Sequence, residues 1–214
     1  MSNLKSIRSG ETIIYTQLAS GYDSSSGFRD AFSRIMGTSP TRLEDSLVLK
    51  AAWLDTRLGP MIAIGDESML YLLEFVDRRG LELEVERLRK RTKSAIIPGL
   101  TEPIRSIERE LTYYFDGTLT EFKTPLFLMG STFQKSVWEQ LIKIPSGETR
   151  SYSDIAISLG KPTGYRAVAQ ANGANQLAIV IPCHRVINSN GELCGYGGGL
   201  TRKKWLLSHE KYGG

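Results

Sequence analysis

Cysteine and histidine are scarce in this chain, whose 214 residues include only two of each. Cys183 and Cys194 could form at most one disulfide, so the sequence excludes a disulfide-rich scaffold. With His184 and His209 as the only imidazoles, few side chains remain for a metal, and we expect no metal site. The low cysteine content, and residues 1–8 without the apolar core of a secretory signal, predict a reduced, cytoplasmic compartment.

Long hydrophobic runs are also absent. No segment approaches the roughly 20 apolar residues that a membrane-spanning helix needs, so we expect no membrane contact. Hydrophobic residues make up 41% of the chain, which is ordinary for a globular protein of one large or two small domains. The net charge of +4 is compatible with a nucleic-acid partner but is too small to identify one by itself.

Residues 1–44 show the pattern of two short helices. We expect them at residues 11–18 and 28–36, with a glycine- and serine-rich turn between them and Gly37 at the end of the second. Helix, short turn and helix is the plan of a helix-turn-helix, whose second helix reads the major groove. The alternatives are a helical appendage packed on the rest of the molecule, or a chain cut from a longer protein.

The pattern changes over residues 46–127. Aliphatic segments separated by turn signals predict strands at 47–55, 60–64 and 69–75. Helical periodicity follows at 81–91 and 104–115. Strands followed by helices predict a small α+β layer, and its scattered carboxylates predict no nuclease metal site.

The last third of the chain predicts three further helices, at 132–142, 153–159 and 163–174. The short turn at Lys161 and Pro162 gives the second and third a helix-turn-helix arrangement. Small residues on the third helix would allow close approach to a DNA groove, although small residues on a helix more often indicate tight helix packing.

Residues 179–187 carry the clearest chemical signal. A β-branched run leads into Pro182, which fixes φ and offers no N–H, so we expect a strand that ends there. Cys183 would then lie at a strand end beneath a cleft. Sulfur is nucleophilic as the thiolate, and a neighbouring histidine or backbone dipole commonly lowers the thiol pKa. The alternative is a buried structural cysteine.

The residues around Cys183 resemble those of one family. Residues 181–186, Ile-Pro-Cys-His-Arg-Val, are similar to the active-site motif of the O6-alkylguanine-DNA alkyltransferases. The resemblance runs in order from Phe133 to Glu210. Its other segments are 133–138, 149–156, 166–168, Asn175, 195–200 and 205–210.

The resemblance implies an α+β fold in three parts. A ribonuclease H-like domain without a catalytic role would occupy 45–127, and a winged-helix-like catalytic domain 128–214. Residues 21–32, with Gly37 and Pro40, resemble the second helix-turn-helix of AraC-type regulators. Ada-type regulators fuse such a domain to an alkyltransferase. Here 1–44 would be a remnant, because half of that domain is missing, and we expect little operator specificity.

The resemblance also implies a direct-reversal DNA repair activity. The partner would be double-stranded DNA containing O6-alkylguanine, and the damaged nucleotide would be flipped out of the duplex. Its alkyl group would pass irreversibly to Cys183, so that each protein molecule acts once. No cofactor is implied, and we expect a monomer.

Five residues receive catalytic roles by resemblance. Cys183 would be the nucleophile, activated by His184 through a water, with Glu210 fixing the tautomer of the histidine. Tyr152 would donate a hydrogen bond to the flipped guanine. Asn175 would brace the turn between the third helix and the cysteine strand.

The resemblance places DNA-binding residues on the third helix. Arg166 would fill the vacated base stack. The other residues expected to contact DNA are Tyr152, Tyr165, Ala167 and Gln170.

The expected substrate pocket contains Val186, Tyr196 and Gly197. Gly197 departs from the family pattern, because many relatives carry a serine there, so its backbone N–H must contact O6 alone. Cys194 has no family role, and we expect a small core or loop residue.

Other functions remain open on the residues. Alkyltransferase-like lesion sensors lack the cysteine of this motif, so Cys183 argues against that class. A transcription regulator would depend on 1–44, where half of the DNA-binding domain is missing. A cysteine hydrolase is disfavoured because His184 is adjacent in sequence and no oxyanion loop is evident.

Overall fold

The computed structural model describes residues 48–213. The helices and helix-turn-helix expected within 1–44 lie outside the described residues. Among the helices that are described, none is long and apolar enough to cross a membrane. The same part of the chain has no group of three or more His, Cys, Asp or Glu side chains placed to hold a metal ion.

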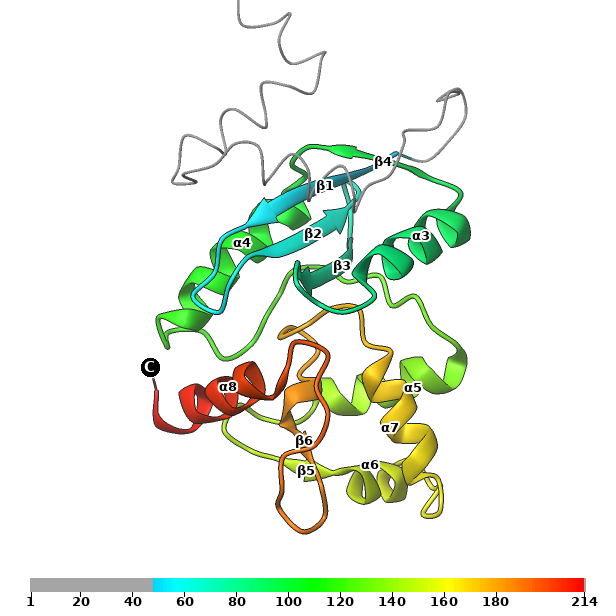
Figure 1. Cartoon of the computed structure of the whole chain (residues 1–214), viewed down its shortest axis with the longest axis vertical. Coiled ribbons are helices and arrows are strands. Elements are labelled where there is room, and N and C mark those ends of the chain that lie inside the picture. The colour runs from blue at the N-terminus through cyan, green and yellow to red at the C-terminus, as the bar shows by residue number, and fades with distance from the viewer. Residues whose placement is uncertain (1–47, 214) are drawn as a thin grey trace, which may run out of the picture.

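A four-stranded sheet forms the first half of the structure, in the order β3-β2-β1-β4. Strands β1 (Val48–Leu54), β2 (Met61–Gly65) and β3 (Leu70–Phe75) form an antiparallel meander (Figure 1), which confirms the three expected strands. Strand β4 (Ala95–Pro98) pairs parallel to β1 and was not expected, because four residues ending in proline give little strand signal.

Two helices cover the two faces of this sheet. Helix α3 (Leu81–Thr92) packs with Leu72 of β3, whereas α4 (Glu102–Phe115) packs with Leu73 and Phe75. Because alternate side chains of a strand point to opposite faces, these contacts bury β3 on both sides. Both helices confirm the sequence-based expectation to within two residues.

The second half is helical. It contains α5 (Thr132–Ile142), α6 (Tyr152–Ser158), α7 (Tyr165–Gly173) and α8 (Leu200–Tyr212), with a short parallel pair of β5 (Arg150–Ser151) and β6 (Val186–Ile187). Capping boxes at Ser131 and Ser151 fix the starts of α5 and α6. The expected helices over 132–142, 153–159 and 163–174 are confirmed, and α8 is an addition.

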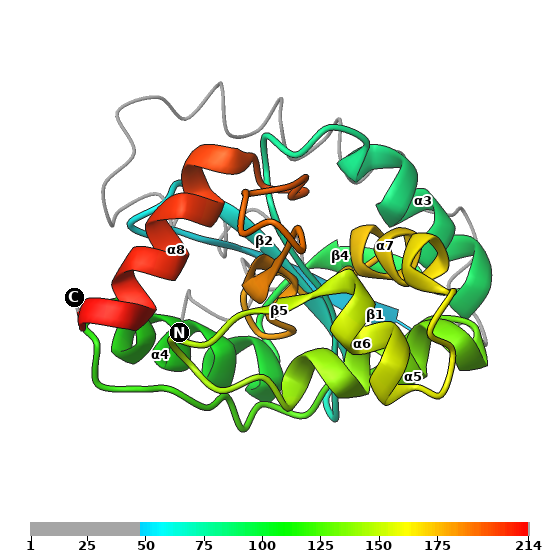
Figure 2. The ribbon, with the colours of Figure 1, turned by 90° about the horizontal axis from the view of Figure 1, so that it is seen from below.

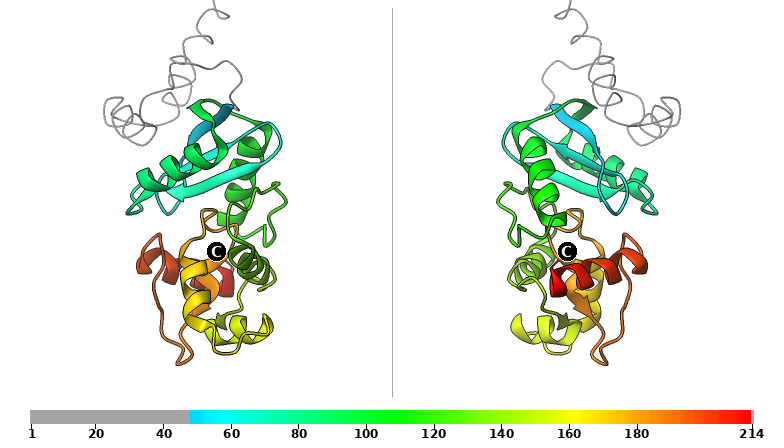
Figure 3. Two further views of the ribbon diagram at one scale, coloured as in Figure 1. Left: turned by 90° about the vertical axis from the view of Figure 1, so that its right-hand side faces the viewer. Right: turned by 90° about the vertical axis from the view of Figure 1, so that its left-hand side faces the viewer.

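The two halves share one hydrophobic core, although they lie one above the other (Figure 3). Leu73 and Phe75 of the sheet belong to the same buried cluster as Trp138 and Leu206 of the helical half. The backbone joins them as well: Leu73 N–H donates to Gln176 O (2.9 Å), and Ala178 N–H donates to Leu73 O (2.8 Å). The segment that follows α7 is therefore fastened to the edge of the sheet.

The prediction of a strand that leads into Cys183 is wrong. Residues 178–180 form a turn in which Ile179 has a φ of 71°, and Ile181 N–H donates back to Leu177 O. Cys183–Arg185 then forms a 3₁₀ turn that begins after Pro182. Burial of Ile179 and Ile181 in the shared core explains their β-branched character without a strand, since tertiary packing overrides local propensity. In Figure 2 this segment lies between α8 and α7.

Candidate active site

A pocket of about 280 Å³ lies where the sheet half meets the helical half. Cys183 is in its wall and is 7% exposed. Of the expected site residues, the pocket also gathers Tyr152, Asn175, Tyr196 and Gly197. The remaining wall residues are Glu74, Arg78, Ala169, Asn172, Gly173, Ala178, Gly195 and Gly198.

Val186 does not line this pocket, so the structure does not support its expected place there. Its side chain is fully buried in the core, and its carbonyl accepts a hydrogen bond from Lys203 Nζ (2.5 Å). The reason is packing: Val186 begins β6, and its side chain belongs to the hydrophobic core that the two halves share.

Asn175 holds the turn before Cys183. Its Nδ2 donates to Ile181 O (2.9 Å), and its Oδ1 accepts from Leu177 N–H (2.9 Å), as expected for a brace. The same Nδ2 lies 3.1 Å from Cys183 Sγ and donates to it. This sulfur contact was not anticipated, and it gives Asn175 a direct influence on the thiol.

His184 and Glu210 form a buried pair. His184 Nε2 lies 2.7 Å from Glu210 Oε1, and both side chains are almost fully buried. Burial raises the Glu210 pKa, but hydrogen bonds from His184 and Arg185 and the charge of Arg185 outweigh it and hold that pKa well below its usual range. Burial lowers the His184 pKa, so the imidazole is neutral at pH 7. A neutral ring facing a carboxylate carries its proton on Nε2, which leaves the unpartnered Nδ1 free to accept a proton.

Sequence reasoning missed two residues that complete this pair. Arg185 donates two hydrogen bonds of 2.9 Å to Glu210, from Nε to Oε2 and from Nη2 to Oε1. Tyr114 OH donates to Glu210 Oε1 (2.7 Å). Arg185 is adjacent to the Cys-His motif and could have been proposed from it, whereas Tyr114 lies on α4 of the other half and gives no sequence signal.

The resting thiol is neutral. Burial raises the pKa of Cys183 to about 11, although the Asn175 hydrogen bond and the charges of Arg78 and Lys203 lower it. Proximity of a histidine therefore does not produce a thiolate in the free protein. The proton must leave when the substrate is bound, and His184 Nδ1 is a buried acceptor in the adjacent residue.

Tyr152 lies at the start of α6, with Cys194 beside its hydroxyl. The Cys194 thiol donates to Tyr152 OH (3.2 Å), and the buried Lys203 Nζ donates to Cys194 O (2.9 Å). Burial and the Cys194 contact raise the Tyr152 pKa, so the phenol keeps its proton. Cys194 is a partly buried loop residue, within the expectation of a small core or loop residue, and it lies beside the site.

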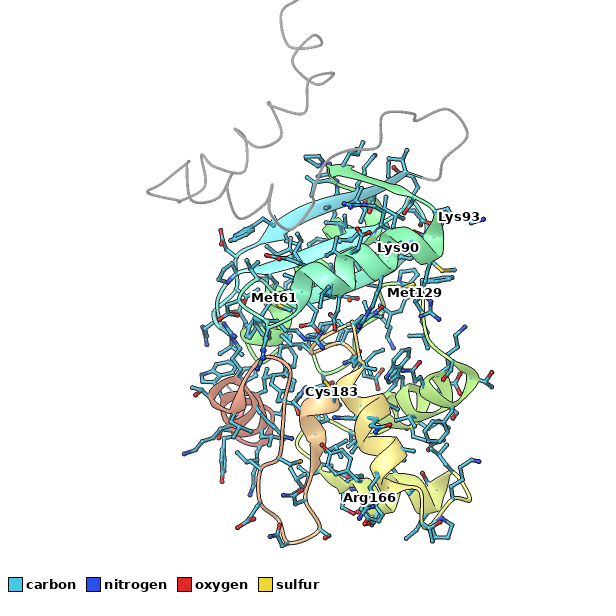
Figure 4. The ribbon with its side chains drawn as sticks, turned by 45° about the vertical axis from the view of Figure 1, so that its right-hand side comes forward. Met61, Lys90, Lys93, Met129, Arg166 and Cys183 are labelled. Atoms are coloured by element: carbon cyan, nitrogen blue, oxygen red, sulfur yellow. The ribbon has the colours of Figure 1, made fainter. Side chains whose placement is uncertain are left out.

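The expected DNA-binding residues on α7 lie on one exposed face. Tyr165, Arg166, Ala167 and Gln170 are all solvent-exposed, whereas Val168 and Ala171 face the core. Arg166 lies at the lower end of α7, away from the sheet, and Cys183 lies near the junction of the two halves (Figure 4). Of the small residues on this helix, Ala171 packs in the core and Ala167 is exposed, so the approach of α7 to a DNA groove stays a prediction.

This geometry is that of a protein with a nucleophilic cysteine beside a surface suited to nucleic acid. A pocketed thiol with a hydrogen-bonded sulfur, a buried histidine–carboxylate pair and a nearby phenol donor is suited to attack by sulfur on a bound group. The adjacent helix with an exposed arginine is suited to a nucleic-acid surface.

Comparisons with known proteins identify the family. Residues 132–212 match the model of the 6-O-methylguanine DNA methyltransferase DNA-binding domain. The methylated-DNA–protein-cysteine methyltransferase of Methanosarcina barkeri is 41% identical over 159 residues, which cover 74% of this chain and 94% of the relative. The corresponding protein of Mycobacterium leprae is 43% identical and covers 74% and 90%.

Solved structures agree. A crystal structure of Mycobacterium tuberculosis OGT in complex with DNA is similar with a TM-score of 0.65 at 41% identity, covering 77% of this chain and 93% of the other. The O6-methylguanine-DNA methyltransferase of Pyrococcus kodakaraensis has a TM-score of 0.57 at 26% identity, covering 76% and 98%. The chain therefore belongs to the family of methylated-DNA–protein-cysteine methyltransferases, enzymes of direct-reversal DNA repair.

Proposed function

We propose that this protein flips O6-alkylguanine out of double-stranded DNA and transfers the alkyl group to Cys183. The observation that supports this assignment is the position of the Cys183 sulfur in the pocket wall, with Asn175 Nδ2 at 3.1 Å from it. The exposed face of α7 beside the pocket would contact the duplex, with Arg166 in the vacated stack.

The residues divide the work of transfer. His184 Nδ1 takes the thiol proton through a water, and Glu210 stabilises the resulting imidazolium. The sulfur attacks the alkyl carbon, the carbon–oxygen bond breaks, and its electron pair leaves with guanine. Tyr152 OH donates to the guanine as this negative charge develops.

The product is a thioether, which is a poor leaving group, so each molecule reacts once. The exchange of an alkyl–oxygen bond for an alkyl–sulfur bond drives the step, and the reaction needs no cofactor. We further propose that the protein is a monomer, because each step uses residues of one chain. The cytoplasm is the proposed compartment, as the low cysteine content predicts.

The domain assignments belong to the same proposal. Residues 45–127 would be the ribonuclease H-like domain and 128–214 the winged-helix-like catalytic domain, with 1–44 as an Ada-like remnant of an AraC-type helix-turn-helix. The division agrees with a sheet half and a helical half that meet at the pocket.

Intact-mass analysis after incubation with duplex DNA carrying O6-methylguanine tests the proposed reaction. We expect a gain of one methylene per molecule, located on the peptide that contains Cys183. A gain on another peptide, or none with fully folded protein, would contradict the assignment.

A further inference from the structure

Arg78 reaches into the pocket from the half of the molecule that the family model does not cover. It lies in the loop between β3 and α3 (Figure 1), and its side chain is 8% exposed. Its Nη1 donates to Asn175 O and its Nη2 to Gly173 O, both at 3.3 Å. It therefore contacts the turn whose asparagine holds the Cys183 sulfur.

Two carboxylates hold Arg78 in place. Its Nη1 donates to Glu84 Oε2 (2.8 Å) on α3 and, at closer range, to Glu74 Oε1 on β3. Burial raises the pKa of Glu74 to about 8, although Arg78 lowers it. Glu74 Oε2 is buried without a hydrogen-bond partner and can carry the proton. Protonation of Glu74 removes one of the two negative charges that face Arg78, while Glu84 still pairs with it.

Gly197 makes room for the guanidinium. A Cβ atom at this position would lie 2.9 Å from Arg78 Nε and 3.2 Å from Cζ, closer than carbon normally approaches. Gly197 does not have a positive φ, so its backbone conformation does not require glycine. Space for Arg78 is thus a physical reason for glycine where many relatives are expected to carry serine.

The charge of Arg78 acts on the nucleophile. It lowers the Cys183 pKa, whereas the ionised form of Glu74 would raise it. The other ionisable groups around the thiol are Lys203 of α8, which also lowers its pKa, Tyr152 of α6, Tyr196, and the His184–Glu210 pair. Among them, Arg78 alone combines a charge effect on sulfur with contacts to Asn175 and Gly197.

We propose that Arg78 is a positioning residue of the alkyl-transfer site, which fixes the Asn175 turn and the Gly197 loop and favours the thiolate of Cys183. The proposal rests on the proposed function, in which Cys183 is the acceptor. It makes the sheet half part of the reactive centre rather than only a support for it.

The test is the pH dependence of the single-turnover rate with free O6-benzylguanine, which needs no base flipping. Arg78→Met should raise the apparent thiol pKa by about one unit, which is at the low end of the shifts caused by a neighbouring charge. Below that pKa the rate should fall about tenfold, because less thiolate is present. Arg78→Lys keeps the charge and should restore most of the pH profile. Gly197→Ala should shift the profile in the same direction as Arg78→Met, because its Cβ displaces the guanidinium from a folded protein.

Arg109→Met is the matched control, since it removes an arginine from an exposed ion pair with Glu102 away from the pocket. It should leave the pH profile unchanged. A pH–rate profile that is unshifted in both Arg78→Met and Gly197→Ala overturns the proposal. A rate that falls equally at every pH, together with a lower melting temperature, also overturns it. Iodoacetamide labelling of Cys183, read by peptide mass, measures the thiol pKa without alkyl transfer. If alkyl transfer is not observed, the labelling experiment still decides whether Arg78 lowers the thiol pKa.

Discussion

Asn175 and Cys183 are joined by a hydrogen bond from Nδ2 to Sγ at 3.1 Å, while the same amide group closes the turn between them. One side chain thus sets both the position of the sulfur and part of its electrostatic environment. This double role makes Asn175 a sensitive point for mutation.

Asn175→Ala should lower the free energy of unfolding by about 1–3 kcal/mol, because buried backbone groups lose their partner. It should also raise the apparent pKa of Cys183, because a donor to the thiolate is lost. Denaturant unfolding and the pH–rate profile measure the two effects. Asn190→Ala, which removes a surface amide bonded to Glu192, should change neither.

Cys183→Ala should abolish alkyl transfer and leave DNA affinity nearly unchanged, because affinity depends on phosphate and groove contacts. Transfer is measured by loss of label from O6-methylguanine duplex, and affinity by gel shift. Cys194→Ser is the control: its hydroxyl can still donate to Tyr152 OH, so the variant should retain transfer. Methyl transfer by the alanine variant, or methylation of Cys194, would show that another group is the acceptor.

Arg166→Ala should separate flipping from chemistry. Extrusion of a nucleotide costs a few kcal/mol, so losing the residue that fills the stack should slow reaction with duplex DNA by about tenfold or more. Reaction with free O6-benzylguanine should change much less. Equal losses on the two substrates would mean that Arg166 supports the fold or the thiol instead.

Glu74 should make stability depend on pH. Burial raises the pKa of Glu74 in the folded protein to about 8, whereas in the unfolded chain this carboxyl has its ordinary pKa near 4.5. Between these values the folded state binds more protons, so the free energy of unfolding falls as pH rises, by at most about 1.4 kcal/mol per unit. Glu74→Gln should flatten this decline in denaturant unfolding.

Glu67→Gln is the control for that experiment, because Glu67 is exposed and pairs with Lys50 at the surface. Its curve of stability against pH should follow the wild type. A Glu74→Gln curve that also follows the wild type between pH 5 and 8 would show that Glu74 is ionised throughout that range.

Deletion of residues 1–44 should leave the single-turnover rate constant within a few-fold. One helix-turn-helix makes about half the base contacts of a complete AraC-type domain, and each contact contributes roughly 1–3 kcal/mol of discrimination. The full chain should therefore bind promoter-like and random duplexes about equally at fixed salt. A sequence preference that disappears on deletion would identify a regulator.

Local pattern predicted the regular elements well. Helices α5 and α7 have the apolar spacing that their burial requires, and β1 to β3 are aliphatic segments bounded by turns. The segment before Cys183 was predicted incorrectly because its β-branched residues fill a core shared by both halves. No local pattern distinguishes that burial from a strand.

The site residues also divide into those that a motif identified and those that only the packing of the two halves reveals. The roles assigned to Cys183, His184 and Glu210 came from a resemblance, and the structure brings the last two within hydrogen-bonding distance. Arg78 could not have been found this way, since nearly a hundred residues separate it from Asn175. Contacts of that kind depend on how the halves pack, which no motif encodes.

The hydrogen bonds between Leu73 and residues 176–178 have a consequence for how the molecule is made. During synthesis Leu73 emerges roughly a hundred residues before its partner segment, so this part of the sheet edge stays unpaired meanwhile, a state prone to association with other chains. Closing so long a loop is also among the slower steps of folding. The turn that presents the thiol is thereby completed late, and a nascent chain would gain its reactivity only after both halves have met.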